Sequence, residues 1–186
     1  VRTPSATHGF GAYARLVDVT INGAGATFPA PLYNAWSQEY GQQRKVAINY
    51  QAIGSGGGIK AITARSVDFG ATDSPMTDAE LSQAAGVIHI PTCVGCVVAA
   101  YNIPGAPTSI RLTGQVLADI FTGNIGTWNH AAIAGLNPGV RLPALRIVPV
   151  SRADSSGTTA IFTSYLARVS ASFKSEIGEG KSVNIR

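Results

Sequence analysis

Short apolar runs alternate with glycine- and hydroxyl-rich turns along most of this chain. Residues 17–22 and 46–53 alternate apolar and polar positions with the period of two that predicts β-strands. Residues 30–40 carry apolar side chains at helical spacing, directly after Pro29, a residue favoured at helix starts. Strands that alternate with helices in this way predict an α/β fold.

The same alternation continues downstream. Residues 54–58 predict a glycine-rich turn, residues 59–64 a short helix and residues 67–71 a short strand. Two further apolar runs, at residues 87–101 and 146–150, also predict strands.

Local signals predict where two more helices begin or end. Residues 114–121 form a helical pattern that Thr113 can cap and Gly123 can close, and residues 77–80 fit a capping box. Four aromatic side chains are expected in the core: Trp36, Phe121, Trp128 and Phe162.

Three loops between a predicted strand and a predicted helix share small and hydroxyl-bearing residues, at positions 23–28, 54–58 and 151–158. A helix that starts on such residues offers unpaired backbone N–H groups, and small side chains let an anion approach. Arg152 adds a planar permanent cation, and Asp73 follows a strand end. One such loop is weak evidence, but three together suit a tetrahedral oxyanion.

Composition fits a globular domain with a real core. Of 186 residues, 45% are hydrophobic and 13% are charged. The formal charge of +4 comes from scattered basic residues, which argues against a nucleic-acid partner. Apolar windows are too short to predict a membrane span.

The two cysteines form a CVGC motif at Cys93 and Cys96. Thioredoxin-like motifs lie at a helix start, whereas this one lies in the predicted strand at residues 87–101. Residues three apart on a strand point to opposite faces, so we expect buried free thiols. A disulfide needs a local break, which Gly95 could allow.

Several long motifs, in order, resemble the periplasmic phosphate-binding proteins that feed bacterial ABC-type phosphate importers. They read NGAGATFPAPLY, NYQAIGSGGGIKAI, VDFGATDSPMT, LADIFTGNIGTWN, LNPG and SRADSSGTTAIFTSYLARVS. The resemblance runs from about Val19 to the last residue. It implies a two-lobed α/β clamp of the type II periplasmic-binding-protein kind, with the anion held in the cleft. The two cysteines depart from the family, which typically has apolar residues or glycine there.

The resemblance also implies which residues contact phosphate. They are Thr27, Phe28, Ser55, Asp73, Arg152, Ser156, Gly157 and Thr158. Asp154 is expected to brace Arg152 from behind rather than touch the anion.

Asp73 is the most informative of these residues, because a carboxylate repels an anion. It suits a ligand that keeps a proton to donate, as phosphate does near neutral pH. Fully ionised sulfate would leave two acceptors facing each other, at a cost of several kcal/mol. We therefore interpret Asp73 as a filter against sulfate; the alternative is that it only caps the turn before Pro75.

The resemblance divides the chain into a first lobe at residues 17–92 and a partial second lobe at residues 93–186, with a crossing at 91–97. Residues 1–16 match nothing in the family. Family members are longer, so we expect the second lobe and a returning segment of the first to be incomplete in this chain.

The functional expectation is reversible, high-specificity capture of inorganic phosphate and its delivery to a membrane ABC permease. The expected location is periplasmic or extracellular, and neither a cofactor, a metal nor covalent chemistry is implied.

The main alternative is a secreted phosphatase, or another phosphoester-handling enzyme, that uses the same oxyanion loops. It would need a metal cluster or an activated nucleophile. His8, His89 and His130 lie far apart with no partner ligands at suitable spacing, and Ser156 lacks a G-x-S-x-G elbow. A third possibility is a fragment with no stable fold.

Overall fold

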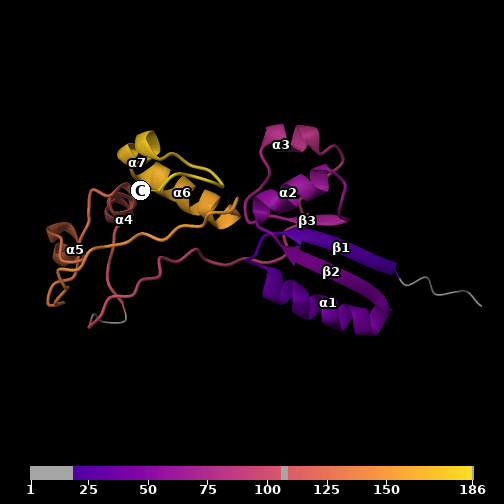
Figure 1. Ribbon diagram of the computed structural model, residues 1–186, viewed down its shortest axis with the longest axis horizontal. Helices are drawn as coiled ribbons and strands as arrows, with labels where there is room; N and C mark the ends of the chain where they lie inside the picture. The colour runs from indigo at the N-terminus through magenta and orange to yellow at the C-terminus, as the bar shows by residue number, and fades with distance from the viewer. Residues whose placement is uncertain (1–18, 106–108, 186) are drawn as a thin grey trace, which may run out of the picture.

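The structure, a computed structural model, describes residues 19–105 and 109–185 and forms two lobes joined by extended segments (Figure 1). The sheet lobe contains β1 (Val19–Gly25), α1 (Ala30–Arg44), β2 (Val46–Ala52), α2 (Ser55–Thr63), β3 (Phe69–Ala71) and α3 (Asp78–Gln83). The helical lobe contains α4 (Gly114–Thr122), α5 (Ala131–Leu136), α6 (Gly157–Val169) and α7 (Ala171–Glu176). The α/β expectation is confirmed.

The sheet has the order β2-β1-β3, and both strand pairs are parallel. Helices α1 and α2 cover its opposite faces (Figure 1). On one face, the Phe69 ring packs edge-on against Tyr33 of α1. On the other, a side chain at Gly70 would meet Ile62 of α2. Parallel strands between helices bring all three carboxyl ends to one edge of the lobe.

Helix α2 begins at Ser55, so the glycine-rich segment forms its first turn rather than the separate turn that we expected. The glycines of this segment let the first turn of α2 lie close against the sheet. A Cβ at Gly58 would lie 2.6 Å from the Cα of Gly25 and 2.7 Å from the carbonyl oxygen of Ala71. The start of α2 therefore rests directly on the carboxyl ends of β1 and β3.

The helical lobe has two small hydrophobic cores. One contains Val116, Ile120, Ile125, Ile133 and Ile147; the other contains Ala118, Leu166, Ala167 and Phe173. The predicted caps are confirmed, because Thr113 accepts a hydrogen bond from the backbone of Val116 and Gly123 adopts a left-handed conformation at the end of α4. The predicted capping box at α3 is present too.

Three of the four predicted core aromatics pack against these cores: Phe121, Trp128 and Phe162. The prediction for Trp36 is wrong, since this residue is 46% exposed. Helix α1 buries no residue fully, and Trp36 stacks on Tyr33 at its surface.

The two predicted strands at residues 87–101 and 146–150 do not form. The second run contributes only an isolated antiparallel bridge between Arg146 and Thr127. Apolar side chains within both runs, such as Val98 and Val148, are largely exposed. A strand needs a neighbouring strand for its backbone groups. Within the described residues, the run at 87–101 has none, and the run at 146–150 has only the bridge at Arg146.

The expectation of buried thiols is also wrong, because Cys93 and Cys96 are both exposed and free. It relied on the strand that is absent. Residues 1–16, which we expected to match nothing in the family, lie outside the described part of the chain. Among the described helices, none combines the length and the apolar character needed to cross a membrane.

Candidate functional site

The three sheet-lobe positions of the predicted site lie where the parallel strands end. Thr27 follows β1, Ser55 is the first residue of α2 after β2, and Asp73 follows β3. Ser55 is almost fully buried, and its hydroxyl oxygen accepts a hydrogen bond from the backbone N–H of Asp73 at 3.2 Å. The Ser55 hydroxyl hydrogen stays available to a further acceptor.

The helical lobe presents the start of α6. The Ser156 side chain caps this helix by accepting from the N–H of Thr159, and its own N–H donates to the carbonyl of Lys181 at 2.9 Å. Within the described residues, the N–H groups of Gly157 and Thr158 have no acceptor. These donors lie at the positive end of a helix of 13 residues, a favourable place for an anion.

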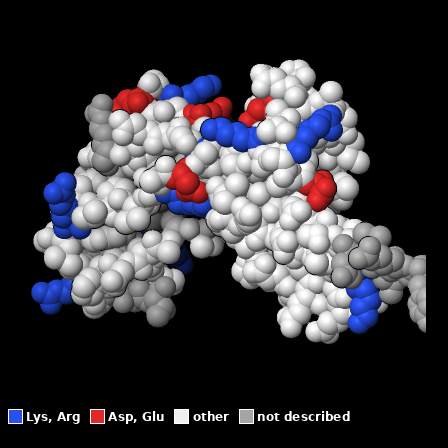
Figure 2. Space-filling model, turned by 45° about the vertical axis from the view of Figure 1, so that its right-hand side comes forward, with Lys and Arg blue, Asp and Glu red and all other residues white. Residues whose placement is uncertain are grey.

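The two sets of loops meet at the junction of the lobes. The Thr158 hydroxyl donates to the Asp73 carboxylate at 3.1 Å, and the N–H of Gly56 donates to the carbonyl of Ser155 at 3.0 Å. The approach is tight, because a Cβ at Gly157 would lie 2.8 Å from the Cβ of Asp73. Figure 2 shows basic and acidic side chains at this junction, beside a hollow between the lobes.

Arg152 extends from the helical lobe across the junction. Its Nε donates to Asp154 Oδ1 at 2.8 Å, a second guanidinium nitrogen pairs with Oδ2, and a third donates to the Thr27 hydroxyl at 2.9 Å. The hydrogen bonds from Arg152 lower the pKa of Asp154, and those to Asp154 raise the pKa of Arg152. Both groups therefore stay charged, and Asp154 directs the cation toward the sheet lobe.

Phe28 lies next to Thr27 and is 48% exposed. The ring faces the crossing segment, since a Cβ at Gly95 would lie 2.5 Å from the ring atom Cζ. The Phe28 N–H has no acceptor among the described residues. The structure thus gathers all the predicted site residues at one junction.

One interlobe contact has no counterpart in the sequence prediction. Lys181 Nζ pairs with Glu80 Oε1 at 2.7 Å, and the two side chains are 18% and 31% exposed. The hydrogen bond from Lys181 lowers the pKa of Glu80. The capping-box pattern identified Glu80 only as a helix-start residue, and no local signal marks Lys181. Because the Lys181 carbonyl also holds Ser156, this pair ties α3 to the start of α6.

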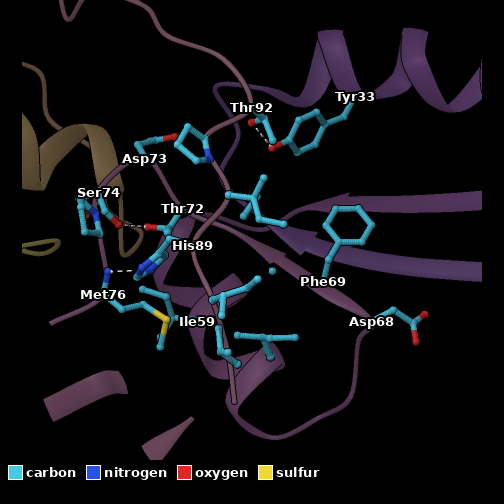
Figure 3. Close-up of a pocket in the computed structure, with 18 of the residues that line it drawn as sticks. Tyr33, Ile59, Asp68, Phe69, Thr72, Asp73, Ser74, Met76, His89 and Thr92 are labelled. Atoms are coloured by element: carbon cyan, nitrogen blue, oxygen red, sulfur yellow. Dashed lines mark hydrogen bonds between the residues drawn. The ribbon is translucent and has the colours of Figure 1, made fainter. Parts of the chain in front are cut away.

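A separate cavity of about 800 Å³ lies beside β3 (Figure 3). Asp73 lies at its border with the junction, and Phe69 and Ile59 contribute apolar walls. His89 lines it too, and its Nε2 accepts from the N–H of Met76 at 3.2 Å. Within the described residues, no group of three or more histidine, cysteine, aspartate or glutamate side chains is placed to hold a metal ion.

Comparison with known protein families finds a match over nearly the whole chain. The sequence profile of the PBP superfamily domain matches residues 6–184. The chain belongs to the PBP superfamily. Its two-lobed α/β architecture, with loops that meet between the lobes, fits this assignment.

Relatives within the PBP superfamily include proteins named phosphate-binding protein PstS. The one from Xylella fastidiosa strain 9a5c is 49% identical over 166 residues, which are 89% of this chain and 45% of the relative. The one from Pasteurella multocida is 47% identical and covers 88% of this chain and 48% of the relative. The chain therefore spans about half the length of the curated relatives it matches.

Solved structures support the same fold. A Clostridium perfringens protein, solved with bound phosphate and assigned to the phosphate ABC transporter substrate-binding proteins, matches with a TM-score of 0.61 and 24% identity over 79% of this chain and 56% of that one. An ABC-type phosphate transport receptor from Vibrio cholerae matches with a TM-score of 0.50 and 20% identity over 78% of this chain and 54% of that one.

Proposed function

We propose that this chain binds inorganic phosphate between its two lobes and delivers it to a membrane ABC transporter. One observation carries the proposal: Arg152 reaches across the junction to Thr27, beside the unpaired N–H groups of α6. The names of the PstS relatives support the choice of ligand.

Phosphate would be held mostly by neutral donors, with one formal countercharge. In the proposed complex, Arg152 pairs with the anion, and the hydroxyls of Thr27 and Ser55 donate to its oxygens. Thr158 donates through its backbone N–H, because its hydroxyl already donates to Asp73. The N–H groups of Phe28 and Gly157 add donors without adding net charge. Ser156 acts by holding the start of α6 in place.

Asp73 would supply the specificity. Its carboxylate already accepts one hydrogen bond, from Thr158, and a carboxylate oxygen can accept more. A protonated phosphate oxygen donates to it, whereas sulfate has no proton to offer near neutral pH. The repulsive contact therefore rejects sulfate more than it weakens phosphate.

The proposal also covers the division into lobes, the location of the protein and the absence of turnover. We propose lobes at residues 17–92 and 93–186 with the crossing at residues 91–97, and a place of action outside the cytoplasm, in the periplasm or at the cell envelope. The relatives carry the name of a binding protein rather than of an enzyme, and we propose binding without turnover.

Calorimetric titration of this chain with phosphate and then sulfate near pH 7 tests the proposal. We expect saturable phosphate heat and none from sulfate. Equal heats from both anions would contradict the role of Asp73. Absence of phosphate heat, in a sample that melts cooperatively, would overturn the proposed function. Release of product from a chromogenic phosphate ester would instead support a phosphoester enzyme.

A further inference from the structure

The CVGC segment crosses between the lobes as extended chain with two exposed thiols. Residues 87–103 contain neither a hydrogen-bonded turn nor a bend. Cys93 and Cys96 are both exposed and free. They are thus accessible to a reagent in solution, and the proposed function leaves them without a role.

Contacts on either side of Cys93 fix this segment against the start of α1. Just before it, the Thr92 hydroxyl lies 2.8 Å from the Tyr33 hydroxyl of α1 (Figure 3). Just before Cys96, Gly95 lies against the ring of Phe28, so closely that a Cβ there would overlap the ring. The CVGC segment therefore packs against a residue of the proposed phosphate site.

A disulfide between these thiols is incompatible with the extended path. Three residues of extended chain separate the two Cα atoms by about 10 Å. A disulfide needs Cα atoms roughly 4.4 to 6.8 Å apart. The chain can make this turn, because Gly95 would stand at the third turn position, where a positive φ is required in a type II turn. Closing it must shorten the crossing and move Gly95 relative to Phe28.

We propose that Cys93 and Cys96 form a disulfide-modification site that weakens phosphate binding when oxidised. The reactant is a dithiol-oxidising disulfide, either a small molecule such as oxidised glutathione or a protein disulfide. One cysteine thiolate attacks the reagent and releases one thiol, and the second cysteine then displaces the other. The chain loses two hydrogen atoms in total, and the reagent disulfide becomes two thiols.

The effect on binding follows from the contact that is lost. Phe28 is held on one side by Gly95, and its N–H is a proposed phosphate donor. If Phe28 must be ordered again on binding, the added cost corresponds to a rise in Kd of about two- to tenfold. This inference depends on the proposed function, which places phosphate beside Phe28. An extracytoplasmic location would also permit the disulfide.

The test compares reduced and glutathione-oxidised forms of the whole chain. Free thiols are counted with a chromogenic reagent, mass spectrometry confirms the cross-link, and calorimetry gives the Kd for phosphate. We expect the oxidised chain to be a monomer with both thiols lost and a Kd raised about two- to tenfold. Cys96→Ser, treated in the same way, keeps its Kd once any mixed disulfide with glutathione is removed.

A second variant tests the contact between Gly95 and Phe28 without forming a disulfide. Gly95→Ala places a methyl group against the Phe28 ring. In the reduced state it should raise the Kd by the same two- to tenfold range. Gly126→Ala is a matched control, because its added Cβ meets nothing within 4 Å. It should leave the Kd unchanged.

Three outcomes would overturn the inference: both thiols persist after oxidation, disulfides form only between chains, or the intramolecular disulfide leaves the Kd equal or lower. Failure of the proposed function is visible separately, because the reduced wild-type chain would then show no phosphate heat. In that case the thiol count still decides whether the disulfide site exists.

Discussion

The two lobes bring opposite chemistry to their junction. The sheet lobe contributes hydroxyls and one carboxylate, at Thr27, Ser55 and Asp73. The helical lobe contributes the cation Arg152 and the open start of α6. An anion would thus be attracted mainly from one side and discriminated on the other. Under the proposed function, we expect single substitutions to change anion attraction and anion selectivity independently.

The largest effect should come from the attracting side. Arg152→Met removes the only formal positive charge of the proposed site and leaves Asp154 without its partner. We expect phosphate affinity to fall by about 2 to 5 kcal/mol, measured by calorimetry. Arg152→Lys is the control, because it keeps charge but loses the forked pairing with Asp154, and should recover only part of the affinity. Equal phosphate Kd values for Arg152→Met and the wild type would contradict the proposed role of Arg152.

Asp73→Asn should change selectivity more than affinity. It removes the like-charge contact, so sulfate should gain up to several kcal/mol in affinity. The measurement is the ratio of sulfate to phosphate Kd in the variant and in the wild type. Asp68→Asn, outside the junction, is the control and should leave the ratio unchanged. If sulfate still fails to bind Asp73→Asn, the filter lies elsewhere.

Gly157→Ala tests whether the two sides must meet closely. The new Cβ would overlap Ser55 Oγ and lie 2.8 Å from the Cβ of Asp73. Overpacking of this kind costs about 1 to 3 kcal/mol, which should appear as weaker phosphate binding. Gly135→Ala in α5 meets nothing within 4 Å and should bind as the wild type does.

The smallest expected effect is a loss of stability when the ion pair between Lys181 and Glu80, away from the proposed phosphate contacts, is removed. Glu80→Gln and Lys181→Met each remove one charge, and glutamine can still serve the capping box at Thr77. We expect up to about 1 kcal/mol of lost stability for either variant and no further loss for the double variant. Additive losses in thermal melts would show that the two side chains act separately.

The same pair should depend on pH. Because the pKa of Glu80 is lowered in the folded chain, the stabilisation is complete above the ordinary glutamate pKa of about 4.3 and is lost as pH falls through the lowered value. Glu80→Gln should therefore lose less stability than the wild type on acidification.

Sequence reasoning located the loops of the site better than it described the chain between them. Local chemistry marked the start of α6 at Gly157. It placed the start of α2 at residue 59 rather than at Ser55, and Ser55 was identified only through the family resemblance. The apolar run at residues 87–101 has the composition of a strand, but a strand also needs a neighbour, which local pattern does not reveal. The wrong prediction of buried thiols at Cys93 and Cys96 followed from assigning residues 87–101 to a strand.

Long-range contacts between side chains were beyond prediction for a similar reason. Lys181 pairs with Glu80 across 101 positions of sequence, and no motif links them. Glu80 had a sufficient local explanation in the capping box, which concealed its second role. The tight approach of Gly157 to Asp73 is likewise a property of how the lobes meet rather than of either loop.

The two tryptophans of the chain fall on different lobes. Trp36 stacks on Tyr33, whose hydroxyl contacts Thr92 of the crossing segment. Trp128 packs against the helical core, and its ring centroid lies 6.0 Å from that of Tyr101. Each lobe therefore carries its own intrinsic fluorophore. Replacing either tryptophan with phenylalanine would confine the tryptophan emission to one lobe. Excited selectively over the tyrosines, that emission would follow ligand-induced motion and melting lobe by lobe without an added dye.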